Sequence, residues 1–150
     1  MAYATTTVLT AAAALVRERL RQRQVVPLAK AIVGEGDDER AVSIGSIASE
    51  LGAVLGLDAG YLRPNETFRE SLRAHRDELG GEVRGLLPRL GLRDVVDPFA
   101  FELLALAEKR FREVPARATH AAFAPMPKNE DEWIERILDM KIADYLMALA

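Results

Sequence analysis

The sequence of 150 residues contains no cysteine and only two histidines, His75 and His120. The lack of cysteine excludes a disulfide-bonded scaffold, a cysteine-ligated zinc site, an iron–sulfur cluster and a cysteine nucleophile. The two histidines are too far apart in the sequence for a metal-binding motif of the HExxH type. Glycine-rich phosphate loops and the GxSxG nucleophile motif are missing as well. We therefore expect no catalytic residue, no cofactor and no bound metal, and a protein that is not an enzyme.

Aromatic residues are scarce, with one Trp, three Tyr and five Phe, so the core has to be built mainly from Leu, Ile, Val and Ala. A hydrophobic share of 49% is that of an ordinary globular domain and argues against a disordered chain. Trp133, the only tryptophan, has two interpretations. It is either a core anchor for the last helix or an exposed anchor for a partner, because tryptophan is enriched at binding hot spots.

Long hydrophobic runs are also absent. The apolar stretch Val8–Val16 is far shorter than the roughly 20 residues that cross a membrane. The first basic residue, Arg17, follows this stretch, whereas a secretory signal has its positive charges before it. We expect a cytoplasmic protein without a membrane association, and a mitochondrial-type presequence is the alternative that the arginine-rich segment leaves open.

Charge is distributed unevenly along the chain, whose formal net charge is −3. Residues 1–34 contain five basic residues, including Arg17, Arg19, Arg21 and Arg23, against a single acid. A basic segment in an otherwise acidic chain is either a solvated helix face or an arm that contacts nucleic acid. Nucleic-acid binding is the less favoured of the two, because no aromatic residue for base stacking lies among the arginines.

Hydrophobic spacing and capping residues predict helices almost throughout. Thr67 and Glu70 have the spacing of a capping box, and Asp97-Pro98 has the composition of a helix start. In the helix that follows, Phe101 is expected to face inward together with other apolar residues. The expected helices cover 7–24, 25–33, 38–55, 67–79, 82–87, 98–113 and 129–150. The fold class is therefore all-α, a small orthogonal or four-helix-type bundle with an extra N-terminal helix, in which 1–34 form a helical arm or layer and 35–150 a single domain.

Four stretches resemble an acyl or peptidyl carrier domain, which is a small four-helix bundle. Ile47–Leu57 is similar to the first helix of that family, and Leu62–Phe68 is similar to the loop that follows it. Asp97–Phe111 resembles the second helix, and Ile142–Leu146 resembles the last one. The resemblance implies a carrier-like core.

The same comparison shows where the chain departs from carrier domains. In that family the serine of an Asp-Ser-Leu motif receives the phosphopantetheine arm, and here Pro98 stands at the serine position. A second register would use Ser71, between Glu70 and Leu72, as the attachment residue. The resemblance therefore implies the fold without the prosthetic group.

The function expected from the sequence is that of a non-enzymatic protein-interaction module with a carrier-like core. The alternatives are a nucleic-acid-associated regulator that uses the basic N-terminal helix, and a genuine phosphopantetheine carrier that uses Ser71. The N-terminal helix is expected to bind a protein partner or to form a homodimer. Its apolar stripe consists of Leu9, Ala13, Val16 and Leu20.

Overall fold

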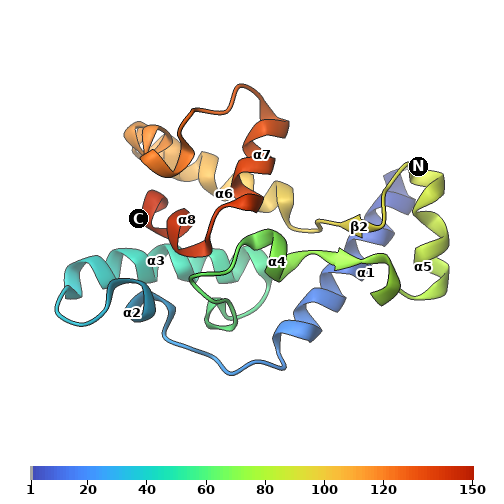
Figure 1. The fold of residues 1–150 in the computed structure, drawn as a ribbon, viewed down its shortest axis with the longest axis horizontal. Coiled ribbons are helices and arrows are strands. Elements are labelled where there is room, and N and C mark those ends of the chain that lie inside the picture. The colour runs from blue at the N-terminus through green and yellow to red at the C-terminus, as the bar shows by residue number, and fades with distance from the viewer. Residues whose placement is uncertain (1) are drawn as a thin grey trace.

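The chain folds into helices joined by short turns, as the capping residues predict (Figure 1). The computed structural model describes residues 2–150. The α-helices are α1 (Ala2–Leu20), α2 (Leu28–Val33), α3 (Asp38–Leu55), α4 (Phe68–Leu72), α5 (Gly81–Leu86), α6 (Ala100–Glu113), α7 (Glu130–Asp139) and α8 (Ile142–Leu149). Five 3₁₀ turns lie between them, at 59–61, 76–78, 88–90, 115–119 and 121–123. Two short strands, β1 (Ala74–His75) and β2 (Val95–Val96), pair in antiparallel fashion. The all-α prediction is confirmed.

Local signals set several helix ends. The side chain of Asp37 accepts a hydrogen bond from the Arg40 amide at the start of α3, and Gly56 ends α3 with a φ of 72°. This left-handed conformation favours glycine because it has no Cβ. Thr67 and Glu70 form the expected capping box at the start of α4.

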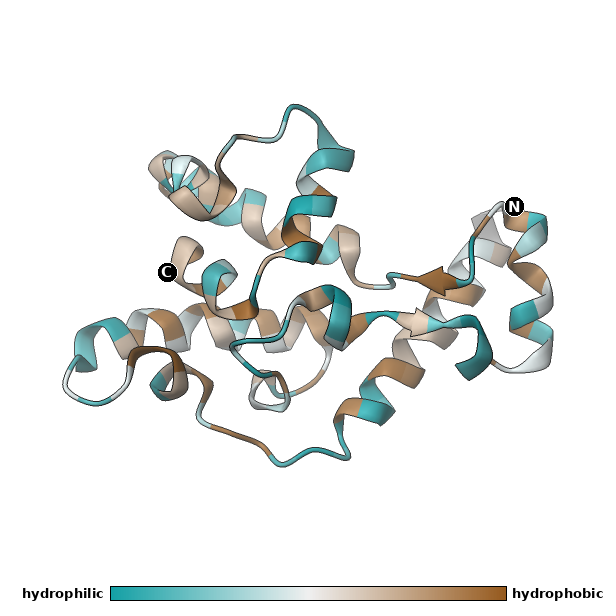
Figure 2. Ribbon diagram, viewed as in Figure 1, coloured by the Kyte–Doolittle hydropathy of each residue, from teal (hydrophilic) through white to brown (hydrophobic). Residues whose placement is uncertain are grey.

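The helix expected over 67–79 ends at Leu72 instead. The backbone of Arg73 is extended, and Ala74 of β1 pairs with Val96 of β2. Figure 2 shows that β2 is apolar. Arg19 of α1 donates to the carbonyl oxygens of Ser71 and Arg73 at 3.1 and 2.9 Å. These oxygens would otherwise accept backbone hydrogen bonds in a longer helix, so contacts from distant parts of the chain stop it here.

The helix expected at 98–113 also begins later, at Ala100. Asp97 does not cap it, because its carboxylate forms a two-point ion pair with Arg73 at 3.0–3.1 Å. The buried face of α6 is made by Ala100, Leu103, Leu104, Leu106 and Ala107. The prediction that Phe101 faces inward is wrong, since its side chain is 62% exposed. Phe99, which is 3% exposed, occupies the core instead.

The last predicted helix is broken into α7 and α8 at 140–141. The amide of Ile142 donates to the carbonyl of Glu66, and the amide of Ala143 donates to the carbonyl of Pro64. The loop before α4 thus accepts hydrogen bonds from the first turn of α8, and these amides are not available to continue α7.

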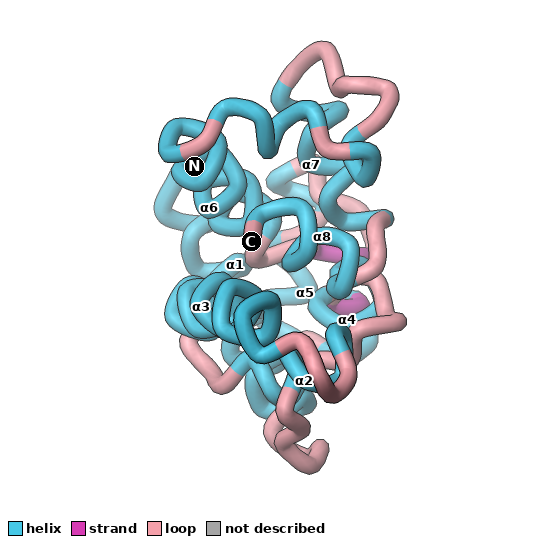
Figure 3. The backbone as a smooth tube through the Cα atoms, turned by 90° about the vertical axis from the view of Figure 1, so that its left-hand side faces the viewer, coloured by secondary structure: helices cyan, strands magenta, loops and turns pink. Residues whose placement is uncertain are grey.

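The four helices α3, α6, α7 and α8 pack together in one half of the molecule, and α1 and α5 lie in the other half (Figures 1 and 3). Tyr145 of α8 is fully buried, and its ring meets that of Phe68 edge to face at 4.9 Å. Burial raises the pKa of the Tyr145 hydroxyl, which donates to the carbonyl of Leu103 at 2.8 Å. The segments that resemble a carrier domain therefore fall on α3, α6, α8 and the loop before α4.

Helix α1 is part of the same hydrophobic core. Its buried residues are Val8, Ala12, Ala13, Val16 and Leu20. It contacts α5, α4 and β1. The N-terminal segment is thus a layer of the fold rather than a free arm. The apolar stripe expected to form a homodimer is covered by the rest of the chain, with only Leu9 half-buried at its edge.

Candidate protein-interaction surface

The two histidines lie on different elements of the fold. His75 is exposed, and its backbone amide donates to Glu78 at 3.0 Å. His120 is exposed in the connection between α6 and α7, where its Nδ1 accepts a hydrogen bond from the Ala122 amide. Within residues 2–150, no group of three or more His, Asp or Glu side chains is placed to hold a metal ion.

Ser71 is buried. Its side chain is 1% exposed, and its hydroxyl donates to Glu66 at 3.3 Å. Glu66 in turn forms a two-point ion pair with Arg23, which also donates to the carbonyl of Tyr61. A phosphopantetheine arm needs an accessible hydroxyl, so this burial disfavours Ser71 as an attachment residue.

Two arginines of the N-terminal segment bind the C-terminal end of α3. Arg17 donates from Nε to the carbonyl of Leu55 at 2.7 Å and lies 5.2 Å from the ring centre of Phe99. Arg21 donates to the carbonyl of Gly56 at 3.3 Å. The last carbonyl groups of a helix lack partners within the helix and carry partial negative charge, so a guanidinium there is favourable.

The other two arginines bind the region around α4. Arg19 forms a two-point ion pair with Glu78 in addition to its bonds to the carbonyls of Ser71 and Arg73. Arg23 is paired with Glu66, as described above. All four arginines therefore contact other parts of the chain, although Arg21 remains exposed, and they do not form a free row for nucleic-acid phosphates.

Trp133 belongs to an aromatic cluster rather than to an exposed site. Its half-buried ring lies 5.4 Å from that of Phe111 and 5.3 Å from that of Phe123. Phe111 and Phe123 also meet edge to face at 5.5 Å. This cluster joins α6, α7 and the connection between them, which agrees with the core-anchor interpretation of Trp133.

One hollow, of about 780 Å³, lies between residues 25–30 and α3. Close packing of the backbone accounts for two of the glycines that line it. A Cβ on Gly60 would come within 2.6 Å of Val25 Cγ1 and 2.7 Å of the carbonyl oxygen of Val26. A Cβ on Gly52 would likewise come within 2.8 Å of the carbonyl oxygen of Leu57. Gly52 and Gly60 are thus explained by the fold.

A second hollow, which we call the α3–α6 groove, has a different composition. Its volume is about 390 Å³, and its apolar floor consists of Ala53, Val54, Ala105 and Leu106. Glu50, Glu102 and Lys109 stand at its rim. Val54 and Glu102 also line an adjoining hollow of about 300 Å³ that extends to α1.

Charges at the rim are partly paired. Lys109 donates to Glu50 at 2.8 Å, and this hydrogen bond lowers the pKa of Glu50. Arg110 approaches the other oxygen of Glu50 at 3.4 Å. Glu102 is exposed and makes no ion pair within the part of the chain that the structure describes.

Phe101 is exposed on α6 close to this groove in the sequence. It precedes Ala105, which lines the groove, by four residues, so the two share one face of the helix. Exposed aromatic side chains are enriched at protein interfaces. Sequence reasoning missed Phe101 because it assigned the ring to the core. The signal that could have found it is the run Leu103, Leu104, Leu106 and Ala107, whose helical phase leaves residue 101 outside.

Comparison with known proteins adds no relative. No protein-family model, no curated protein and no solved structure matches this chain. Within the described residues, no helix is long and apolar enough to cross a membrane.

Proposed function

We propose that the protein is a non-enzymatic protein-interaction module that receives an amphipathic helix on the exposed face of α6. The observation that carries the proposal is Phe101, which is 62% exposed on the same face of α6 as Ala105 of the α3–α6 groove. An apolar groove with a neighbouring aromatic side chain suits a helix whose apolar residues recur at i, i+3 or i+4, and i+7. The rim charges Glu102 and Lys109 would then select the orientation of that helix.

The proposal includes a carrier-like core without a prosthetic group. It is supported by the sequence resemblance and by the packing of α3, α6, α7 and α8 into one bundle. A cytoplasmic location also belongs to the proposal, and the absence of cysteine supports it.

Selection of helical peptides against the full-length protein tests this function without knowledge of the natural partner. We expect the selected peptides to carry helically spaced apolar anchors, and their affinity to fall at least about tenfold for Phe101→Ser. Val42→Ser is the matched control, because Val42 is 73% exposed and lies on α3 about 12 Å along the helix from Glu50. The proposal is overturned if no such peptide is selected or if Phe101→Ser and Val42→Ser affect binding equally.

A further inference from the structure

We infer that the helix received on this surface is α6 of a second copy of the chain, packed antiparallel around a two-fold axis near Ala105. The inference rests on the proposed function, because it names the partner of the same surface. It replaces the N-terminal stripe, which the core covers, as the place of self-association.

The exposed face of α6 has a pattern that is complementary to itself. On one edge of this face, the acid Glu102 lies near the start of the helix and the base Lys109 lies near its end. Glu108 and Arg112 stand on the opposite edge, which also carries Phe101. Residues 102 and 109 are two turns apart, so they stand on the same edge of this face. Ala105 lies between them and is small enough for a second helix to approach closely.

An antiparallel second copy brings unlike charges together. With Ala105 nearest the axis, Glu102 of each copy lies against Lys109 of the other, so every contact is made twice. A parallel second copy would instead set Glu102 against Glu102 and Lys109 against Lys109, which is unfavourable.

The existing contact of Lys109 does not prevent this arrangement. The Lys109 side chain is 53% exposed. Its partner Glu50 also accepts a hydrogen bond from Arg110 at 3.4 Å, so Glu50 is still paired if Lys109 turns to the second copy. Helix α6 has 14 residues and is thus about 21 Å long, so the interface is small. We expect a weak dimer with a Kd on the order of 100 µM, since small interfaces of this kind are transient.

Charge reversal provides a test with an internal rescue. Sedimentation equilibrium of the full chain from about 5 µM to about 1 mM should show a monomer–dimer equilibrium. Glu102→Lys and Lys109→Glu should each weaken the dimer at least about tenfold, because each places like charges together twice. An equimolar mixture of the two variants should form a heterodimer, and the chain with both substitutions should dimerise again.

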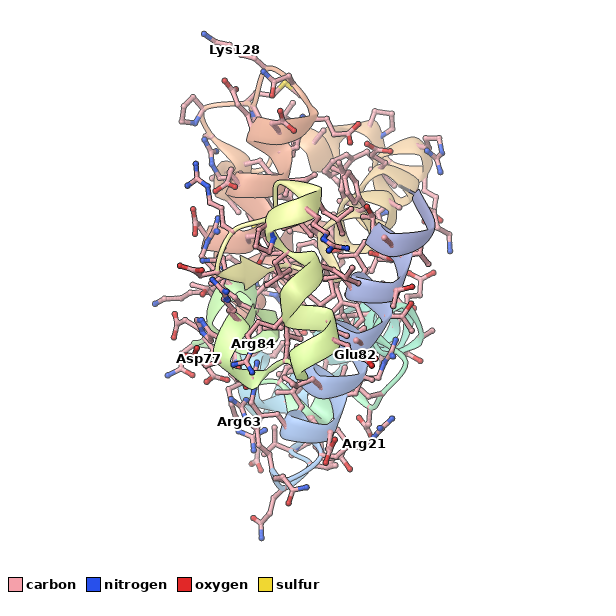
Figure 4. All side chains as sticks on the ribbon, turned by 90° about the vertical axis from the view of Figure 1, so that its right-hand side faces the viewer. Arg21, Arg63, Asp77, Glu82, Arg84 and Lys128 are labelled. Atoms are coloured by element: carbon pink, nitrogen blue, oxygen red, sulfur yellow. The ribbon has the colours of Figure 1, made fainter. Side chains whose placement is uncertain are left out.

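Matched controls separate this effect from a change in net charge. Glu82→Lys on α5 and Lys128→Glu between α6 and α7 alter the charge equally at exposed positions (Figure 4). They should leave the dimer unchanged, and circular dichroism should show that all variants are folded. If Lys109→Glu acted only through Glu50, the second substitution at residue 102 would not rescue it.

The inference is overturned if the protein stays monomeric at about 1 mM, or if the dissociation constant of the dimer is unchanged in both charge-reversal variants. It is also overturned if neither the mixture nor the double variant restores the dimer. A monomer whose peptide binding depends on Phe101 would overturn this inference and leave the proposed function standing. A monomer that also selects no helical peptide would overturn both.

Discussion

Individual polar side chains are used here to hold distant segments together. Ser71, Glu66 and Arg23 form one connected group, and Glu78 accepts from both Arg19 and the His75 amide. Buried or partly buried polar groups of this kind are stable because each has a partner. These contacts lead to two predictions, one about the accessibility of Ser71 and one about the pH dependence of the free energy of unfolding.

Ser71 should remain unmodified when the protein is coexpressed with a promiscuous phosphopantetheinyl transferase. Its hydroxyl is buried and donates to Glu66, so the enzyme cannot reach it in the folded state. Intact-mass measurement checks this, with a genuine carrier domain expressed in parallel to show that the transferase is active. A mass gain that disappears in Ser71→Ala would contradict the prediction and favour the carrier alternative.

Glu78 should contribute stability at neutral pH that is lost in acid. Burial raises the pKa of its carboxyl, but hydrogen bonds from the His75 amide and Arg19 outweigh this effect, so the pKa is lowered overall. A carboxyl whose pKa is lower in the folded than in the unfolded state stabilises the fold above its unfolded value, about 4.3, and loses this contribution as the pH falls through the folded value.

The measurement is urea unfolding of the wild type and of Glu78→Gln between about pH 7 and about pH 3. The difference in free energy of unfolding should be present at neutral pH and shrink below about pH 4. Glu82→Gln serves as the control, because Glu82 is exposed and makes no ion pair within residues 2–150. A difference that stays constant over the whole range would show that Glu78 acts through something other than its charge.

Among the elements, α1 connects parts of the molecule that are distant in sequence. It buries Val8, Val16 and Leu20 against the core, and the arginines at and beyond its C-terminal end bind α3 and the region of α4. Most of the stability of a helix in a protein comes from the packing of its apolar face, so α1 and the rest of the core depend on each other.

Deletion of residues 1–24 should therefore unfold the protein. Burial of a Val or Leu side chain stabilises by roughly 1.5–3 kcal/mol, so three of them approach the 5–15 kcal/mol that a whole domain has available. Circular dichroism should show loss of the cooperative thermal transition. Leu20→Ala offers a milder version with an expected loss of about 2–5 kcal/mol. A truncated chain that still unfolds cooperatively would show that residues 1–24 are dispensable.

The elements also show which features can be predicted from the sequence. A signal within one turn is enough to predict the capping box of Thr67 and Glu70. Helix ends that are set by distant residues cannot be predicted in this way. Arg19 and β2 end α4, and the loop at 64–66 separates α7 from α8. The wrong prediction for Phe101 has another cause, because the helical phase of the α6 leucines places residue 101 outside and Phe99 fills the core position.

For the whole molecule, the position of the charges matters more than their number. The arginines of the N-terminal segment contact acidic side chains and the end of α3, and the net charge of the chain is −3. Figure 4 shows Arg21 and Arg63 at one end of the molecule and Lys128 at the other, so these basic side chains do not gather on one surface.

We accordingly expect no saturable binding to duplex DNA or RNA at physiological salt. Fluorescence anisotropy with labelled duplexes at about 50 and about 150 mM salt measures this, since phosphate contacts weaken steeply over that range. Arg21→Glu reverses the charge of an exposed arginine of the N-terminal segment that makes one backbone contact. Binding that decreases with salt and is lost in this variant would revive the nucleic-acid alternative.

Helix α1 precedes in the sequence the residues that it contacts, and this order has a consequence for biosynthesis. Its partners run from Leu55 to Phe99, so α1 is synthesised before they can cover its apolar face. At translation rates of about 5–20 residues per second, Leu55 follows Leu20 by about 2–7 s and Phe99 follows it by about 4–16 s. Throughout this interval the nascent segment presents an alanine- and valine-rich surface to the cell, and it is the stage of the protein's life at which a chaperone has most to bind.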